Sequence, residues 1–189
     1  TASPKQAMLP QCETLVKFTS VKDLENPARL TTTLSDACHA EPTVLFGCRP
    51  CDARGFVVLD RPYLEGPFKD PYYGARREAT VIVSQACPAA FSTCFCNWVG
   101  SSPSDREGSD ILFTAVDGGF VFEVLTEKGQ ALMENCGFSE ASSRSQEVEA
   151  VHAAAVQTLR PAPDLTDVPA RVRVRFTDEA FWTKETVKC

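Results

Sequence analysis

Two stretches decide the fold that this sequence predicts: Thr43-Val-Leu-Phe-Gly-Cys-Arg-Pro-Cys-Asp52 and Ala79-Thr-Val-Ile-Val-Ser-Gln-Ala-Cys-Pro-Ala-Ala-Phe-Ser-Thr-Cys-Phe-Cys96. Each opens with a run of β-branched and apolar residues that is typical of a buried strand. Each then continues into a cysteine-rich segment, and the two segments hold five of the nine cysteines of the chain. If the two strands are neighbours in one sheet, both segments lie at the same end of it.

The spacing of these cysteines favours a metal site. Cys94 and Cys96 are two positions apart, so that an extended chain directs both sulfurs to one side. Cys48 and Cys51 have the Cys-x-x-Cys spacing that brings two thiols onto one ion or cluster. A lone cysteine is more often a small buried hydrophobe. Disulfides are a further alternative, but nothing marks the chain as secreted.

The bulk composition excludes several classes of protein. A chain of 189 residues with 43% hydrophobic and 23% charged residues is ordinary for one globular domain. The formal net charge of -6 argues against a general nucleic-acid binder. No apolar run is long enough to span a bilayer, so we expect no membrane insertion. The absence of a signal-peptide pattern favours a cytoplasmic location, where thiols stay reduced.

The rest of the sequence predicts an α/β fold, with α+β as the alternative. We expect a mixed sheet with a β-hairpin and flanking helices, and with the cysteine loops at strand ends. The hairpin turns at Asp117-Gly118. The other expected elements are helices over 52–59, 127–135 and 142–159, a strand over 171–176, a loop over 60–77 and a polar surface segment over 23–34, while 13–18 fits either a strand or a helical turn.

Other candidate site residues carry weaker signals. Cys38 and His39 precede the first strand and are candidate ligands, although a histidine is often only structural. Arg76 and Arg77 fit a solvated loop better than a docking surface or a group that compensates an anionic cluster. No acid–base pair or catalytic triad is evident, so the sequence predicts no catalytic residues.

Several of these motifs together resemble one family. They are Phe46-Gly-Cys-Arg-Pro-Cys-Asp52, Asp70-Pro-Tyr-Tyr73 with Arg76-Arg77, Cys87-Pro with Cys94-Phe-Cys96, Gly108-Ser-Asp110 and Thr126-Glu-Lys-Gly129. The family is the iron–sulfur beta subunit of cytoplasmic sulfhydrogenases, with the similar A subunit of anaerobic sulfite reductase. Members generally carry a residue other than cysteine at the position of Cys48, so this chain departs from the pattern there.

The resemblance implies an electron-transfer subunit of a cytoplasmic multi-subunit oxidoreductase, of the hydrogenase, sulfur or sulfite reductase type. Its partners would be flavoprotein or hydrogenase-type subunits, and substrate chemistry would take place on a partner. The implied cofactor is one [4Fe–4S] cluster held by Cys51, Cys87, Cys94 and Cys96, with Cys48 and Asp52 as further candidates. Thiolates are the usual ligands of such clusters.

The resemblance also implies a division of the chain. Residues 1–185 would form a single domain, and 186–189 would begin a ferredoxin-like module with two [4Fe–4S] clusters, whose first ligand would be Cys189. We therefore expect the residues after Phe176 to pack poorly.

The alternative to the iron–sulfur reading is a structural zinc site in a non-redox interaction module. Four thiolates from Cys48, Cys51, Cys94 and Cys96 would suit tetrahedral zinc equally well, because spacing alone does not separate the two metals.

Overall fold

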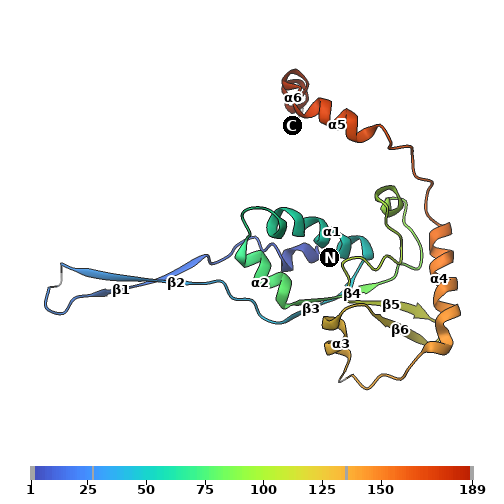
Figure 1. Cartoon of the computed structure of the whole chain (residues 1–189), viewed down its shortest axis with the longest axis horizontal. Coiled ribbons are helices and arrows are strands. Elements are labelled where there is room, and N and C mark those ends of the chain that lie inside the picture. The colour runs from blue at the N-terminus through green and yellow to red at the C-terminus, as the bar shows by residue number, and fades with distance from the viewer. Residues whose placement is uncertain (1–2, 27, 135, 188–189) are drawn as a thin grey trace.

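The computed structural model describes residues 3–26, 28–134 and 136–187, and it has the mixed α/β fold that the sequence predicts (Figure 1). A four-stranded sheet forms the centre, with helices packed on its faces. A separate two-stranded ribbon extends from one side of the molecule, and the last two helices lie away from the sheet. No helix among these described residues is both long and apolar enough to cross a membrane.

The central sheet has the strand order β3-β4-β5-β6. β3 (Thr43–Cys48), β4 (Thr80–Gln85) and β5 (Ile111–Val116) are parallel, and β6 (Gly119–Val124) is antiparallel to β5. The predicted hairpin is confirmed, with Gly118 at a φ of 69° in its turn. Because β3 and β4 are parallel neighbours, the cysteine segments that follow them leave the sheet at the same edge.

Helix α1 (Pro50–Asp60) follows β3 directly and confirms the predicted helix. Pro50 occupies its first turn, where its missing N–H is no loss. Ala53 and Phe56 are buried in a core with Met8, Tyr73 and Ile82. On the opposite face of the sheet, a second core contains Val83, Ile111 and Phe113, with Leu132 and Met133 packed against it.

The predicted loop over 60–77 is wrong, because most of it is helical. A short π-helix, η2 (Arg61–Glu65), continues α1, and α2 (Pro71–Ala79) follows. The Asp70 carboxylate accepts hydrogen bonds from the Tyr72 and Tyr73 backbone N–H groups at 2.9 and 3.0 Å. Asp-Pro therefore begins a helix here, with Asp70 as the cap and Pro71 as the first helical residue.

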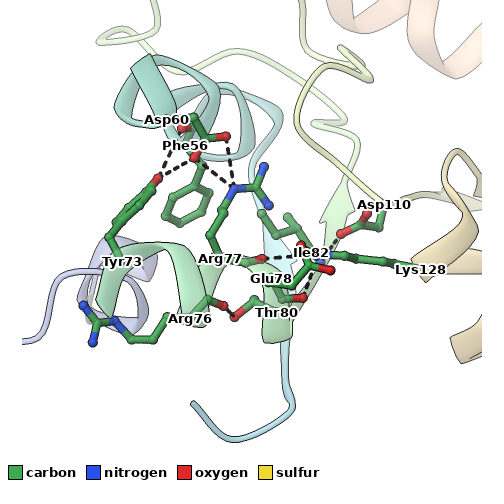
Figure 2. Close-up of polar contacts among 10 residues, drawn as sticks. All are labelled: Phe56, Asp60, Tyr73, Arg76, Arg77, Glu78, Thr80, Ile82, Asp110 and Lys128. Carbon is green, nitrogen blue, oxygen red and sulfur yellow. Dashed lines mark hydrogen bonds and ion pairs between the residues drawn. The ribbon is translucent and has the colours of Figure 1, made fainter. Parts of the chain in front are cut away.

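A polar network joins α1, α2 and α3 (Glu127–Met133) (Figure 2). Asp60, at the end of α1, accepts from the Tyr73 hydroxyl at 2.6 Å and from Nε of Arg77 at 3.2 Å. Lys128 Nζ donates to the Glu78 carbonyl at 2.7 Å, which ties α3 to the end of α2. Asp110 accepts from the Ile82 backbone N–H at 2.8 Å. The bonds to Asp60 fix the C-terminal end of α1. The N-terminal end of α1, with Cys51, lies where β3 ends.

The two-stranded ribbon consists of β1 (Val16–Lys22) and β2 (Leu30–Asp36), which pair in antiparallel register. The sequence did not decide whether 13–18 is a strand or a helical turn, and in the structure 16–18 belong to β1. The segment 23–34, which was expected to be polar surface, contains most of β2. Phe18 and Leu34 are directly opposite each other, with exposed fractions of 72% and 70%. Strand formation here follows the β-branched run Thr31-Thr-Thr33, while the lack of burial explains why the pattern was weak.

The C-terminal part of the chain is helical. The short 3-10 helix η4 (Ser142–Arg144) leads into α4 (Ser145–Gln157), which confirms the helix predicted over 142–159. The predicted strand over 171–176 is wrong, since α5 (Val168–Phe176) covers it, followed by α6 (Glu179–Thr186). Pro169 near the start of α5 favours a helix, and no strand of the described residues lies beside it to form a ladder. No residue of α5 or of the described part of α6 is buried.

Helix α4 packs on β5 through a histidine that makes stability depend on pH. His152 Nε2 lies 2.8 Å from the Thr114 hydroxyl. Burial lowers the pKa of His152 below 6.5, and Arg106 adds to this effect, while Glu123 and Glu149 oppose it. The unfolded chain therefore binds more protons than the folded one as the pH falls through about 6.5, and folding stability decreases.

We expect the thermal unfolding midpoint to fall between pH 7 and pH 5, with a smaller fall in His152→Gln. The control is His39→Gln, because His39 is exposed and pairs with the exposed Glu41. An equal pH dependence in wild type and His152→Gln would contradict this account.

Candidate metal centre

Four of the predicted ligands line one pocket of about 320 Å³. Cys51 comes from the first turn of α1, Cys87 and Cys94 from the loop after β4, and Cys96 from the start of the 3-10 helix η3 (Cys96–Val99). Most of the remaining wall is apolar, with Ala90, Phe95, Val99, Pro103 and Leu159 among its residues. No Asp, Glu or His is among the described residues that line it.

The backbone around Cys87 is anchored to the sheet. The Ala86 N–H donates to the Phe113 carbonyl, and the Cys87 N–H donates to the Pro103 carbonyl, both at 2.9 Å. The position of Cys87 is therefore set by β5 and by the segment that leads into it. Cys51 lies at the N-terminal end of α1, where the helix dipole favours a negatively charged group.

The segment with Cys94 and Cys96 is held by local turns. The Cys94 N–H donates to the Phe91 carbonyl at 3.0 Å, and the Phe91 N–H points at Cys94 Sγ at 3.2 Å. The Ser101 N–H donates to the Cys96 carbonyl at 2.9 Å, after Gly100 has ended η3 with a φ of 72°. An N–H directed at a cysteine sulfur stabilises the thiolate form that binds iron.

The C-terminal end of α4 clamps this cysteine loop. Thr158 Oγ1 accepts from the Ala90 N–H, and the Arg160 carbonyl accepts from Nδ2 of Asn97, both at 2.8 Å. The Arg160 guanidinium also lies over the Trp98 ring, 5.5 Å from its centre. Sequence reasoning missed this contact, since nothing in the residues 158–160 signals a partner more than sixty positions earlier.

The electrostatics of the pocket disfavour free thiolates. Burial raises the pKa of Cys51, and Asp52, Cys87 and Cys96 raise it further. Burial also raises the pKa of Cys87, although Arg49 acts against this, and Cys94 and Cys96 contribute in the same sense as burial. Neighbouring thiolates repel one another. The four cysteine side chains are therefore stable only as neutral thiols or when they surround a positively charged centre. A bound metal reverses the balance, because it deprotonates the thiols that coordinate it.

The four thiols line one pocket, but their sulfurs do not meet at a single point. Among the described residues, no three His, Cys, Asp or Glu side chains form a group that could hold a metal ion as they stand. All eight cysteines of the described part are free thiols. The donor set and the apolar wall fit a thiolate-held group, and the assignment of Cys51, Cys87, Cys94 and Cys96 as ligands stays a prediction.

The structure does not bring Cys48 to the four-thiol pocket. Cys48 is 6% exposed and packs in the core with Met8 and Ile82. It lines a different pocket of about 900 Å³, together with Asp52. The zinc set that includes Cys48 is therefore not assembled here, and Cys189 lies outside the described residues.

The weaker candidates also lie elsewhere. Cys38 Sγ contacts the Pro71 carbonyl at 3.3 Å, and His39 pairs with Glu41 at 2.8 Å. Arg76 forms an ion pair with Glu13, and Arg77 forms one with Asp60. None of these side chains lines the pocket of the four cysteines.

Comparison with known proteins gives a partial relative. Over 87 residues the chain is 38% identical to subunit beta of sulfhydrogenase 2 from Pyrococcus furiosus, which is 46% of this chain and 25% of that subunit. The match thus spans about a quarter of the relative's length. No protein family model matches the chain, and no solved structure matches it. The partial match supports a relationship to hydrogenase beta subunits.

Proposed function

We propose that this chain is an iron–sulfur electron-transfer domain of a multi-subunit oxidoreductase, of the hydrogenase, sulfur or sulfite reductase type. Cys51, Cys87, Cys94 and Cys96 hold one [4Fe–4S] cluster in this proposal. The observation that carries it is that these four thiols, from three separate segments, line one pocket. The similarity to a sulfhydrogenase subunit supports the redox class.

The arrangement of the thiols favours a cluster over a single zinc ion. Four cysteines on one zinc each lie about 2.3 Å from it, so their sulfurs lie close together. In a four-iron cluster each cysteine binds a different iron, so the sulfurs are spread more widely. Four thiols from three segments that surround a pocket of about 320 Å³ are in keeping with the second case.

The residues of the chain would bind, insulate and position the cluster, which supplies reversible one-electron storage when bound. Phe95, Val99 and Leu159 supply apolar surface to the wall around the cluster. The N-terminal end of α1 and the Phe91 N–H stabilise negative charge at Cys51 and Cys94. No Asp, Glu or His is among the described residues that line the pocket. In this proposal substrate chemistry takes place on a partner subunit.

The wider setting is part of the same proposal. The partners are other subunits of a redox complex, flavoprotein or hydrogenase-type, in the cytoplasm. Residues 1–185 form one domain, and the segment 186–189 leads into a ferredoxin-like module.

The test is reversible reduction of the protein prepared without oxygen. We expect visible absorption from the cluster that bleaches on addition of dithionite, together with a low-temperature paramagnetic resonance signal from the reduced cluster. Both changes should reverse on mild oxidation. A colourless protein that gives neither change would contradict the electron-transfer role.

A further inference from the structure

We propose that Arg49 compensates the negative charge of the cluster at Cys87 and thereby raises its reduction potential. This inference rests on the proposed function, because it assigns a role to a residue beside the same pocket. The Arg49 side chain is not one of the predicted ligands, and it makes no capping hydrogen bond in α1.

The guanidinium of Arg49 lies beside a predicted ligand. Its Nη1 is 3.9 Å from Cys87 Sγ, and the side chain is partly buried. Arg49 is the N-cap residue of α1, but its side chain makes no capping hydrogen bond. The backbone of Arg49 therefore begins the helix, while its side chain remains available to Cys87. The presence of this cation also lowers the pKa of Cys87 against the effect of burial.

Arg49 differs from Arg54, Arg76 and Arg77 in forming no ion pair with a described carboxylate. Among the described residues, no ion pair involves Arg49, although ten others are formed. Arg54 also lines the pocket, but it pairs with Asp105 and Glu107, each at 3.3 Å. Its charge is thus already balanced. Arg76 and Arg77, the sequence-based candidates for compensating a cluster, are paired with carboxylates away from the pocket.

A fixed cation beside a cysteine ligand has a defined effect on the cluster. Four thiolates give a [4Fe–4S] centre a net negative charge, and reduction by one electron adds to it without forming or breaking a bond. A nearby positive charge therefore stabilises the reduced state more than the oxidised state. The effect is larger beside an apolar pocket than in water, because the effective dielectric constant is lower.

The experiment is a potentiometric titration of the cluster, followed by its paramagnetic resonance signal, in wild type and three variants. Arg49→Gln removes the charge and should lower the reduction potential. Arg49→Lys keeps the charge and should remain near wild type. The matched control is Arg61→Gln, which makes the same change at an exposed site. Arg61 lies just beyond the opposite end of α1, about 18 Å from Arg49 along the helix, and should leave the potential unchanged.

The outcomes separate this inference from the proposed function. Wild type without a reducible cluster contradicts the proposed function itself. A wild-type cluster whose potential is the same in Arg49→Gln overturns the role of Arg49 alone. If Arg49→Gln loses the cluster while Arg49→Lys keeps it, the positive charge is needed for retention, which supports compensation. Loss of the cluster in both Arg49 variants, or an equal drop of potential in both, overturns it, because charge would then not be the property that matters.

Discussion

Cys94→Ser and Cys96→Ser are each expected to lose most of the iron that the wild-type chain binds when it is prepared without oxygen. Both residues line the four-thiol pocket, and serine offers a poor ligand for iron in a sulfur-rich site. Loss of an outer-shell partner already lowers metal affinity about 10–100-fold, so loss of a direct ligand should exceed that. The measurement is iron and acid-labile sulfide per chain, with the visible absorption of each variant.

The controls for this prediction are cysteines outside the pocket. Cys12 and Cys136 are exposed and line no part of it, so Cys12→Ser and Cys136→Ser should keep the full complement of iron. Cys48→Ser is the informative intermediate case, because Cys48 is predicted as a possible ligand but packs in the core. Iron loss in Cys48→Ser would make it a ligand. Full iron in both Cys94→Ser and Cys96→Ser would refute the ligand assignment.

Gly108→Ala is expected to destabilise the protein by about 2–5 kcal/mol. Gly108 has a φ of 84°, which is unfavourable for a residue with a Cβ. A Cβ built there would lie 2.3 Å from the Ala53 carbonyl oxygen and 2.9 Å from Cγ2 of Val57, both in α1. The helix backbone cannot yield easily, because its far end is tied to α2 through Asp60. Urea unfolding monitored by circular dichroism measures the change.

The matched control for Gly108 is Gly118 in the β5–β6 turn. Gly118 has a φ of 69°, but nothing lies within 4 Å of a Cβ built on it. Gly118→Ala therefore carries only the backbone strain, about 1–2 kcal/mol. Equal losses of stability in the two variants would show that the contact with α1 contributes nothing.

The sequence predicted the elements whose patterns are set by burial in the sheet. The run 80–83 belongs to a buried inner strand, whereas 43–46 belongs to an edge strand and was predicted from its apolar residues although Phe46 is 67% exposed. The β5–β6 hairpin has a turn that only a few residue pairs satisfy. The β1–β2 ribbon was mostly missed because its side chains are exposed, so no alternation of burial marked it. The alternating segment 171–176 predicted a strand, but a strand needs a paired neighbour, and none of the described strands pairs with this segment.

The sequence predicted those parts of the site that depend on the spacing of cysteines along the chain and on the order of adjacent strands. Cys87, Cys94 and Cys96 belong to one segment, and adjacent parallel strands bring Cys51 to the same edge. The core position of Cys48 was not predictable, because the residue ends β3 on its buried face, one step before the chain turns into α1. The contact of Arg49 with Cys87 and the clamp from Thr158 depend on long-range packing, which residue spacing does not encode.

The most direct test of the central claim is elemental analysis of the wild-type chain purified without oxygen. A [4Fe–4S] cluster in the four-thiol pocket predicts about four iron and four sulfide per chain for that pocket, with little zinc. A colourless protein with about one zinc per chain and no sulfide would contradict the cluster and establish a structural metal site in its place.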